Sequence, residues 1–175
     1  MEDINIYKCL HEYNIEENIE FTCNKCSTKD SLSKTSICKL PDLLIIHLKR
    51  FRFEGNNPIK INNKIDFPLN NFDLNVVFNE GSTNYDYTQS NAKDNNFYDL
   101  FAVVNHSGNV FGGHYTCSCL VENGLQKKWL YYDDDHVYEL QGNVENEIVT
   151  RKAYILFYRR QRMSSSSLIQ LSNYC

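Results

Sequence analysis

The stretch GGHYTCSCLVENGLQKKWLYYDDD, residues 112–135, contains two strand-like runs that meet at Asn123-Gly124. An Asn-Gly pair between such runs is the strongest short signal for a β-hairpin, because a type I′ turn needs a positive φ at both central residues. With these two residues as the loop, counting outward along both strands places His114 opposite Asp133. Cβ atoms of directly opposed residues lie about 4.5–5.5 Å apart. The carboxylate of Asp133 can therefore accept a hydrogen bond from an imidazole N–H of His114.

The pairing of His114 has two interpretations. A histidine oriented by an aspartate is the base half of a nucleophilic site, because the aspartate fixes the tautomer and stabilises the imidazolium. The alternative is an incidental pair across two strands. The register also matters, since a turn longer by two residues would shift the partner of His114 to Tyr131 or Asp135.

Side chains alternate between the two faces of a strand, so Cys117 and Cys119 point away from His114. This excludes both cysteines as its nucleophile and excludes a metal site built from the three residues; we expect two small buried hydrophobic side chains. The face of His114 also carries Thr116, Ser118, Trp129 and Tyr131. The opposite face is mostly apolar, which predicts that it faces the core, and carries Tyr115, Cys117, Cys119, Val121, Leu130 and Tyr132.

The rest of the chain predicts a mostly antiparallel β domain with little helix. We expect a short helix within residues 2–20, a buried strand at 43–53, a loop at 54–64, and strands at 97–106 and 153–160. Residues 79–96 are polar and rich in Asn and Ser, which predicts a flexible insertion. Residues 161–175 read as a disordered, Ser-rich tail.

Composition excludes several classes of protein. The net charge of -4 and the pI near 5.7 argue against a nucleic-acid binder. No apolar run approaches the roughly 20 residues that span a bilayer, so we expect no membrane partner. The cysteines number seven and no secretory signal precedes them. This favours reduced thiols, and hence the cytoplasm or the nucleus, over a disulfide framework.

Cys23 and Cys26 form a CxxC pair in the polar stretch FTCNKCSTKD. Zinc is favoured over plain thiols here, but a structural zinc site needs four ligands. Cys9 and Cys38 lack a suitable partner spacing, so the pair predicts half of a zinc site.

Seven stretches together resemble the C-terminal half of the catalytic domain of ubiquitin-specific proteases, the papain-like cysteine deubiquitinases. The stretches, in the family's order over about residues 4–160, are FTCNKC, KLPDLLIIHLKRF, IDFPLNNFDL, YDLFAVVNHSG, GGHYTCSC, WLYYDDDHVYEL and AYILFYRR. The resemblance implies an α+β fold, mostly antiparallel β: the fingers and palm of the hand-shaped domain, with most of the thumb missing. Residues 1–160 would then be a partial catalytic domain.

The resemblance also implies roles for individual residues. His114 matches the general base, Asp133 the acid that orients it, and Asp134 a second, supporting acidic position. His106, Gly113 and Tyr115 match residues that border the channel for the ubiquitin tail. Cys23 and Cys26 match the second cysteine pair of a structural zinc site, while catalysis itself needs no cofactor. The segments 107–112 and 54–64 match loops beside the active site.

One departure from the family is large. Its nucleophilic cysteine and an Asn that stabilises the oxyanion belong to a motif near the start of the domain, and no such motif occurs in this chain. Without thiolate and oxyanion donors the acyl transfer cannot proceed at a useful rate. We therefore expect a deubiquitinase part that is inactive alone, with ubiquitin or ubiquitinated proteins as partners and an N-terminal half that carries the cysteine.

Two alternatives remain open at this point. One is a catalytically dead module that binds ubiquitin or acts as a scaffold, which predicts binding without hydrolysis. The other is a chain without stable function, because the apolar surface that the thumb should cover would be bare and would favour aggregation.

Overall fold

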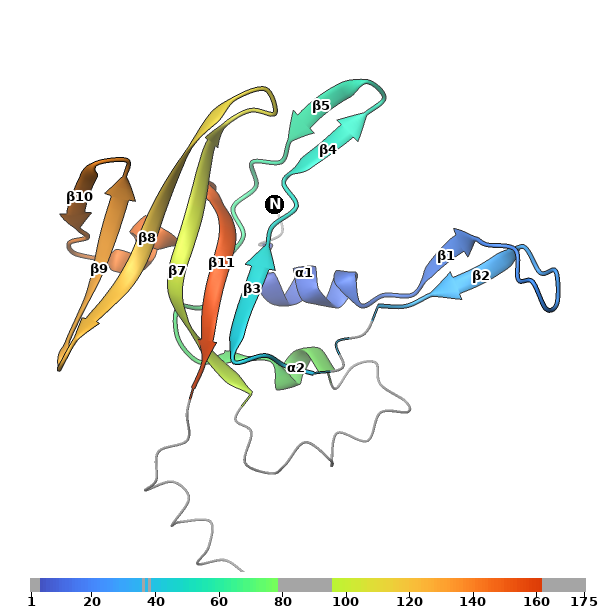
Figure 1. The fold of residues 1–175 in the computed structure, drawn as a ribbon, viewed down its shortest axis with the longest axis horizontal. Coiled ribbons are helices and arrows are strands. Elements are labelled where there is room, and N and C mark those ends of the chain that lie inside the picture. The colour runs from blue at the N-terminus through green and yellow to red at the C-terminus, as the bar shows by residue number, and fades with distance from the viewer. Residues whose placement is uncertain (1–3, 36, 38, 79–95, 162–175) are drawn as a thin grey trace, which may run out of the picture.

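A seven-stranded antiparallel sheet forms the centre of the protein (Figure 1). The structure is a computed structural model that describes residues 4–35, 37, 39–78 and 96–161. The elements are α1 Ile6–Tyr13, β1 Glu17–Glu20, β2 Asp30–Ser33, β3 Leu43–His47, β4 Phe51–Glu54, β5 Asn57–Lys60, β6 Phe72–Asp73, α2 Asn75–Phe78, β7 Phe97–Gly108, β8 Gly113–Asn123, β9 Gln126–Asp133, β10 His136–Glu139, α3 Val144–Ile148 and β11 Ala153–Arg160. The strand order is β10-β9-β8-β7-β11-β3, with β6 beside β7. Two separate hairpins, β1–β2 and β4–β5, project from this body.

The main core lies on one face of the sheet, where α1 and residues 65–74 pack against the long central strands. The helix begins where the Asn5 side chain accepts a hydrogen bond from the Lys8 N–H, a typical N-cap. Two fully buried tyrosines satisfy their hydroxyls by donating to carbonyls: Tyr98 to Pro41 and Tyr158 to Pro68. The fully buried apolar side chains at its centre are Ile6, Phe72, Leu74, Tyr98, Leu100, Val103, Ile148, Ala153, Leu156 and Tyr158.

The expected core side of the β8–β9 hairpin is wrong. Ser118, on the face of His114, is fully buried, and Trp129 and Tyr131 pack against the core cluster. On the opposite face Tyr115 is 54% and Val121 39% exposed. The strand register explains why the face of Ser118 is the buried one, because Ser118 pairs with Val103, which in turn pairs with Leu156. These partners come from distant strands, so the apolar content of the hairpin alone does not reveal which face they share.

The predicted buried strand at 43–53 is also corrected. It is two strands, β3 and β4, and β3 is an edge strand in which Leu43 is 59% and Ile45 61% exposed. The break falls at Arg50, whose side chain is buried among backbone carbonyls. The expected loop at 54–64 contains β5, which pairs with β4.

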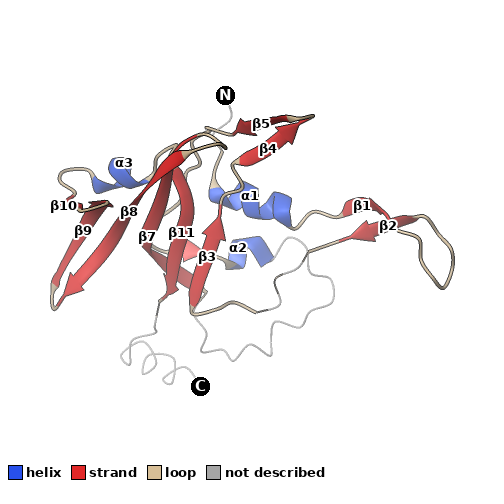
Figure 2. Cartoon of the chain, turned by 45° about the horizontal axis from the view of Figure 1, so that its top comes forward, coloured by secondary structure: helices blue, strands red, loops and turns tan. Residues whose placement is uncertain are grey.

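Two short helices that the sequence did not predict, α2 and α3, complete the fold (Figure 2). Asn143 caps α3 by accepting from the Asn146 N–H. No helix in the described part of the chain is long and apolar enough to cross a membrane.

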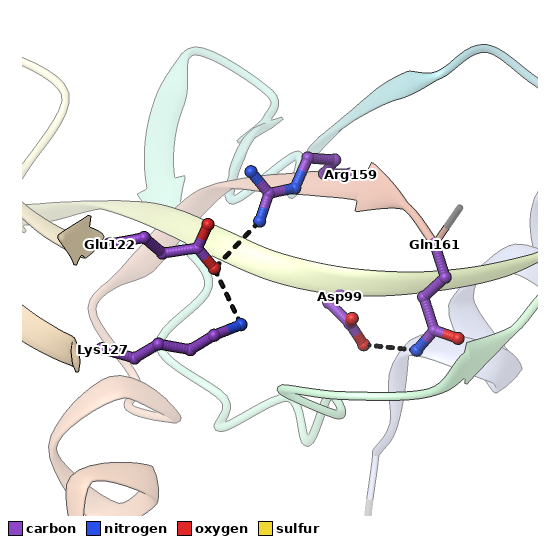
Figure 3. Close-up of polar contacts among 5 residues, drawn as sticks. All are labelled: Asp99, Glu122, Lys127, Arg159 and Gln161. Carbon is purple, nitrogen blue, oxygen red and sulfur yellow. Dashed lines mark hydrogen bonds and ion pairs between the residues drawn. The ribbon is translucent and has the colours of Figure 1, made fainter. Parts of the chain in front are cut away.

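Polar contacts join strands at the end of the sheet away from His114 (Figure 3). Glu122 accepts from Lys127 at 2.8 Å and from Arg159 at 3.2 Å, and both cations lower its pKa. The Gln161 side chain donates to Asp99 at 2.7 Å, so this first residue of the expected tail is bound to the domain. Residues 162–175 of the expected tail and 79–95 of the expected insertion lie outside the described residues.

Candidate active site

The β8–β9 register differs by two residues from the expected one. Asn123 pairs with Gln126, so the two loop residues are Gly124 and Leu125. Gly124 has φ +61° and no other residue of the loop has a positive φ, which matches a type II′ turn with glycine at the first central position. The ladder ends at the pair Cys117–Tyr132, and His114 therefore has no directly opposed partner on β9.

His114 and Asp133 nevertheless meet, along the diagonal of the hairpin. The Nε2 atom of His114 lies 2.5 Å from Oδ1 of Asp133. A shift of two residues preserves the face of every side chain, and diagonal neighbours remain within reach of long side chains. The expected contact is thus present, although the directly opposed register that suggested it is not.

The turn between β9 and β10 positions the acidic residues that follow Tyr132. Asp133 pairs with His136 of β10, which leaves Asp134 and Asp135 as the turn residues. Asp134 has φ +52°, a left-handed conformation that Asp tolerates better than most residues. Ligand atoms of His114, Asp133 and Asp134 all lie within 4.8 Å of one another.

The electrostatics of the pair favour a basic imidazole. The hydrogen bond with Asp133 raises the pKa of His114, followed by the negative charge of Asp133 and then that of Asp134. The side chains of His114 and Asp133 are 49% and 42% exposed, so solvent screens the pair and a reactant can reach it. Such a group can accept a proton from a thiol or water and return it to a leaving amine.

No cysteine sulfur joins this group in the described part of the chain. Cys117 and Cys119 instead contact each other, with 3.3 Å between their Sγ atoms. Cys117 pairs with Val104 and Tyr132, whereas His114 pairs with Ser107, and the alternation along β8 puts the two side chains on opposite faces.

His106, Gly113 and Tyr115 come together, but on the face of the sheet opposite His114. His106 is buried and its ring lies 4.7 Å from that of Tyr115. Burial, followed by the charge of Lys60, lowers the pKa of His106 and so favours its neutral form. Lys60 also donates to the carbonyls of His106 at 2.8 Å and Gly108 at 3.2 Å, which ties the β4–β5 hairpin to the end of β7.

Gly113 is required by this cluster. A Cβ atom at position 113 would lie 2.1 Å from Nε2 of His106 and 2.4 Å from the Ser107 carbonyl oxygen. At Gly112 the same atom would meet nothing within 4 Å. The second glycine of the pair therefore has a steric role that the first does not have.

The sequence did not point to Phe51 and Tyr154, which complete the aromatic cluster. Their rings lie 5.5 and 5.7 Å from that of His106. Both residues come from strands far away in sequence, and only the pairing of β11 with β7 brings Tyr154 near.

Cys23 and Cys26 lie in the loop that connects β1 and β2. The turn is closed by hydrogen bonds from the Ser27 N–H to the Cys23 carbonyl and from the Cys23 N–H to the Thr28 carbonyl. The hydroxyl and N–H of Thr28, followed by the Cys23 thiol, lower the pKa of Cys26 to about 7. A thiol that loses its proton easily, next to a second thiol, suits a soft or borderline metal such as zinc. Among the described residues no third ligand completes the site.

Among the described residues, no other histidine and no cysteine joins the group formed by His114, Asp133 and Asp134. His47 and His136 are exposed; His47 packs edge-on against Tyr154, and His136 pairs with Asp135. Cys9 is half-buried beside the core. Cys38 lies outside the described residues.

Comparison with known proteins identifies the family. The sequence profile of the ubiquitin carboxyl-terminal hydrolases matches residues 5–158. The chain belongs to the ubiquitin carboxyl-terminal hydrolase family. Human ubiquitin carboxyl-terminal hydrolase 31 is 37% identical over 171 residues, covering 88% of this chain and 12% of that protein. Ubiquitin carboxyl-terminal hydrolase 8 of Arabidopsis thaliana is 33% identical over 166 residues, covering 91% and 17%.

Solved structures agree with this membership. A chain of the SAGA Ubp8/Sgf11/Sus1/Sgf73 DUB module bound to ubiquitin aldehyde superposes with a TM-score of 0.68 at 28% identity. The match covers 92% of this chain and 34% of that one. The expected α+β class with mostly antiparallel strands is confirmed. The chain spans well under half the length of the hydrolases that it matches.

Proposed function

We propose that this chain is part of a thiol-dependent deubiquitinase, which hydrolyses the peptide or isopeptide bond after the C-terminal glycine of ubiquitin. The observation that carries the proposal is the 2.5 Å contact between His114 and Asp133 in a chain of the ubiquitin carboxyl-terminal hydrolase family. His114 acts as the general base and Asp133 orients it, while Asp134 supports the site with its charge.

In the proposed reaction a cysteine thiol loses its proton to His114, and the thiolate attacks the carbonyl carbon of the last glycine of ubiquitin. His114 then returns the proton to the departing lysine amine. Asp133 keeps the imidazole in the tautomer whose other nitrogen faces the thiol, and stabilises the imidazolium between the two steps. Water hydrolyses the resulting thioester, and His114 again takes up the proton.

Ubiquitin is the partner that we assign to the His106–Gly113–Tyr115 cluster. The solved relatives include a SAGA DUB module bound to monoubiquitin. We propose that these residues border the channel for the ubiquitin tail: Gly113 leaves the wall low, and the half-exposed Tyr115 ring offers an apolar surface to a Gly-Gly end.

We assign the nucleophile to an N-terminal half outside the 175-residue sequence. The 175-residue chain is therefore proposed to be inactive alone. The catalytic cycle uses no cofactor. Cys23 and Cys26 would hold zinc together with two further cysteines of the complete domain, and would do so in the cytoplasm or nucleus, where thiols stay reduced. Elemental analysis of the chain alone tests the half-site: tightly bound zinc near one ion per monomer would contradict it.

A ubiquitin–fluorophore cleavage assay separates the proposal from its alternative, a scaffold that binds ubiquitin without hydrolysis. The purified chain should release no fluorophore. A chimaera in which residues 4–161 replace the matching part of human ubiquitin carboxyl-terminal hydrolase 31 should release it. A chimaera that binds ubiquitin with no turnover would instead support the scaffold.

A further inference from the structure

Two cysteines of β8 form a dithiol outside the candidate active site. Cys117 and Cys119 are separated by one residue, their side chains share one face of the strand, and their Sγ atoms are 3.3 Å apart. Both are half-buried. Their strand partners are Val104 and Tyr132 for Cys117, and Ala102 and Leu130 for Cys119. A small polar molecule can therefore reach two thiols that are already in contact.

The surroundings of Cys117 favour its protonated form. Burial raises the pKa of Cys117 to about 12, and its hydrogen bond with Cys119 acts in the same direction. Cys117 thus keeps its proton, and in the 3.3 Å contact between the two sulfurs either thiol can be the donor. The thiolate is the form of cysteine that reacts with oxidants.

The backbone geometry permits a bond between these residues. With a rise of about 3.3 Å per residue, residues i and i+2 of a strand have Cα atoms about 6.6 Å apart. Disulfides accept Cα separations up to about 6.8 Å. The pair lies at the upper end of this range, so bridging it would draw the strand together locally. Disulfides that load the backbone in this way are the reducible, regulatory ones.

We propose that Cys117 and Cys119 are an oxidation site, at which a peroxide forms a reversible disulfide within β8 and thereby loosens the contact between His114 and Asp133. The Cys119 thiolate attacks one peroxide oxygen, the O–O bond breaks, and the other oxygen leaves as water or an alcohol. Cys117 then loses its proton and attacks the sulfenic sulfur, and a water molecule leaves as the S–O bond breaks. The two thiols are oxidised by two electrons, and the peroxide is reduced.

The link to the active site runs through the end of the ladder. The pair Cys117–Tyr132 is the last one between β8 and β9. Asp133 directly follows Tyr132, and His114 lies three residues before Cys117. A contraction between positions 117 and 119 therefore displaces the pair that positions both partners of the 2.5 Å contact.

Peptide mass spectrometry tests the chemistry. Trypsin should release residues 94–127, a peptide whose only cysteines are Cys117 and Cys119. After hydrogen peroxide treatment of the intact chain, we expect this peptide to be lighter by two hydrogen atoms and to regain them with dithiothreitol. Three outcomes would overturn the proposal: both thiols still react with an alkylating reagent, they are oxidised to sulfinic or sulfonic acids, or they form disulfides to a second chain. The Cys23→Ser, Cys26→Ser variant should respond in the same way.

A histidine titration by NMR tests the link. In the oxidised chain the pKa of His114 should fall toward its ordinary value, and reduction should restore it. In the Cys117→Ser, Cys119→Ser variant peroxide should leave the titration unchanged. A disulfide that forms while the His114 titration stays the same would refute the coupling to the site.

Discussion

At the scale of single residues, the candidate site depends on His114 and on the carboxylate beside it. Changing Asp133 to Asn removes the negative charge and replaces the charged hydrogen-bond acceptor, both of which raise the pKa of His114, by a neutral amide. We expect this pKa to fall in the variant, by NMR titration, toward the ordinary value of about 6.5. The pKa of His106 is lowered by burial and by Lys60, and should not move.

Asp135→Asn is the matched control, because Asp135 pairs with His136 rather than His114. A similar fall of the His114 pKa in both variants would contradict the specific role of Asp133. The raised pKa of His114 also makes the free energy of unfolding depend on pH. Its stabilising contribution is complete below about pH 6.5. That contribution is lost as the pH rises through the folded-state value, and Asp133→Asn should remove this pH dependence.

Gly113 provides a steric prediction at the same scale. In Gly113→Ala the new methyl group would collide with the ring of His106 and the carbonyl of Ser107. Overpacking of this kind costs about 1–3 kcal/mol, which urea unfolding would measure. Gly112→Ala is the control, since its methyl group meets no atom within 4 Å. Equal stability of the two variants would show that the cluster accommodates a side chain.

At the scale of elements, Arg50 joins the β4–β5 hairpin to the sheet. Its Nε donates to the carbonyl of Ala153 at 2.7 Å, and its Nη1 donates to those of Ile61 and Asn63 at 3.0 and 2.8 Å. Arg50→Met leaves three carbonyls without this donor. We expect the free energy of unfolding to drop by about 3–5 kcal/mol.

Lys49→Met is the control for loss of a positive charge, because Lys49 is exposed. The unfolding free energy of this variant should stay within about 0.5 kcal/mol of that of the unchanged chain. A loss for Lys49→Met as large as for Arg50→Met would remove the assigned role of Arg50.

The elements also show which information the sequence carried. Short-range signals sufficed for β8, β9 and β11, since alternation and turn residues are local. The β8–β9 register was missed because Asn123-Gly124 and Gly124-Leu125 both suit two-residue turns, and the structure uses the second. The contact of His114 with Asp133 was still predicted correctly, because a shift of two residues leaves each side chain on the same face of the sheet. The buried role of Arg50 and the packing of Tyr154 on His106 depend on pairings between distant strands, which no local pattern encodes.

At the scale of the whole molecule, membership of the ubiquitin carboxyl-terminal hydrolase family and the contact between His114 and Asp133 support the proposal that this chain carries one half of an active site. Four apolar side chains of the sheet, Leu43, Ile45, Tyr115 and Val121, are each at least 39% exposed. The proposed N-terminal half would cover apolar side chains of this kind.

The most direct test of this account is turnover of a ubiquitin–fluorophore substrate by the chimaera that carries residues 4–161, compared among three variants. His114→Ala and Asp133→Ala should each lower kcat by at least about 100-fold, because general acid–base catalysis contributes about 10²–10⁴. Asp135→Asn should retain turnover within about tenfold, since its carboxylate faces His136. Turnover unchanged by His114→Ala would contradict the assignment of the active site.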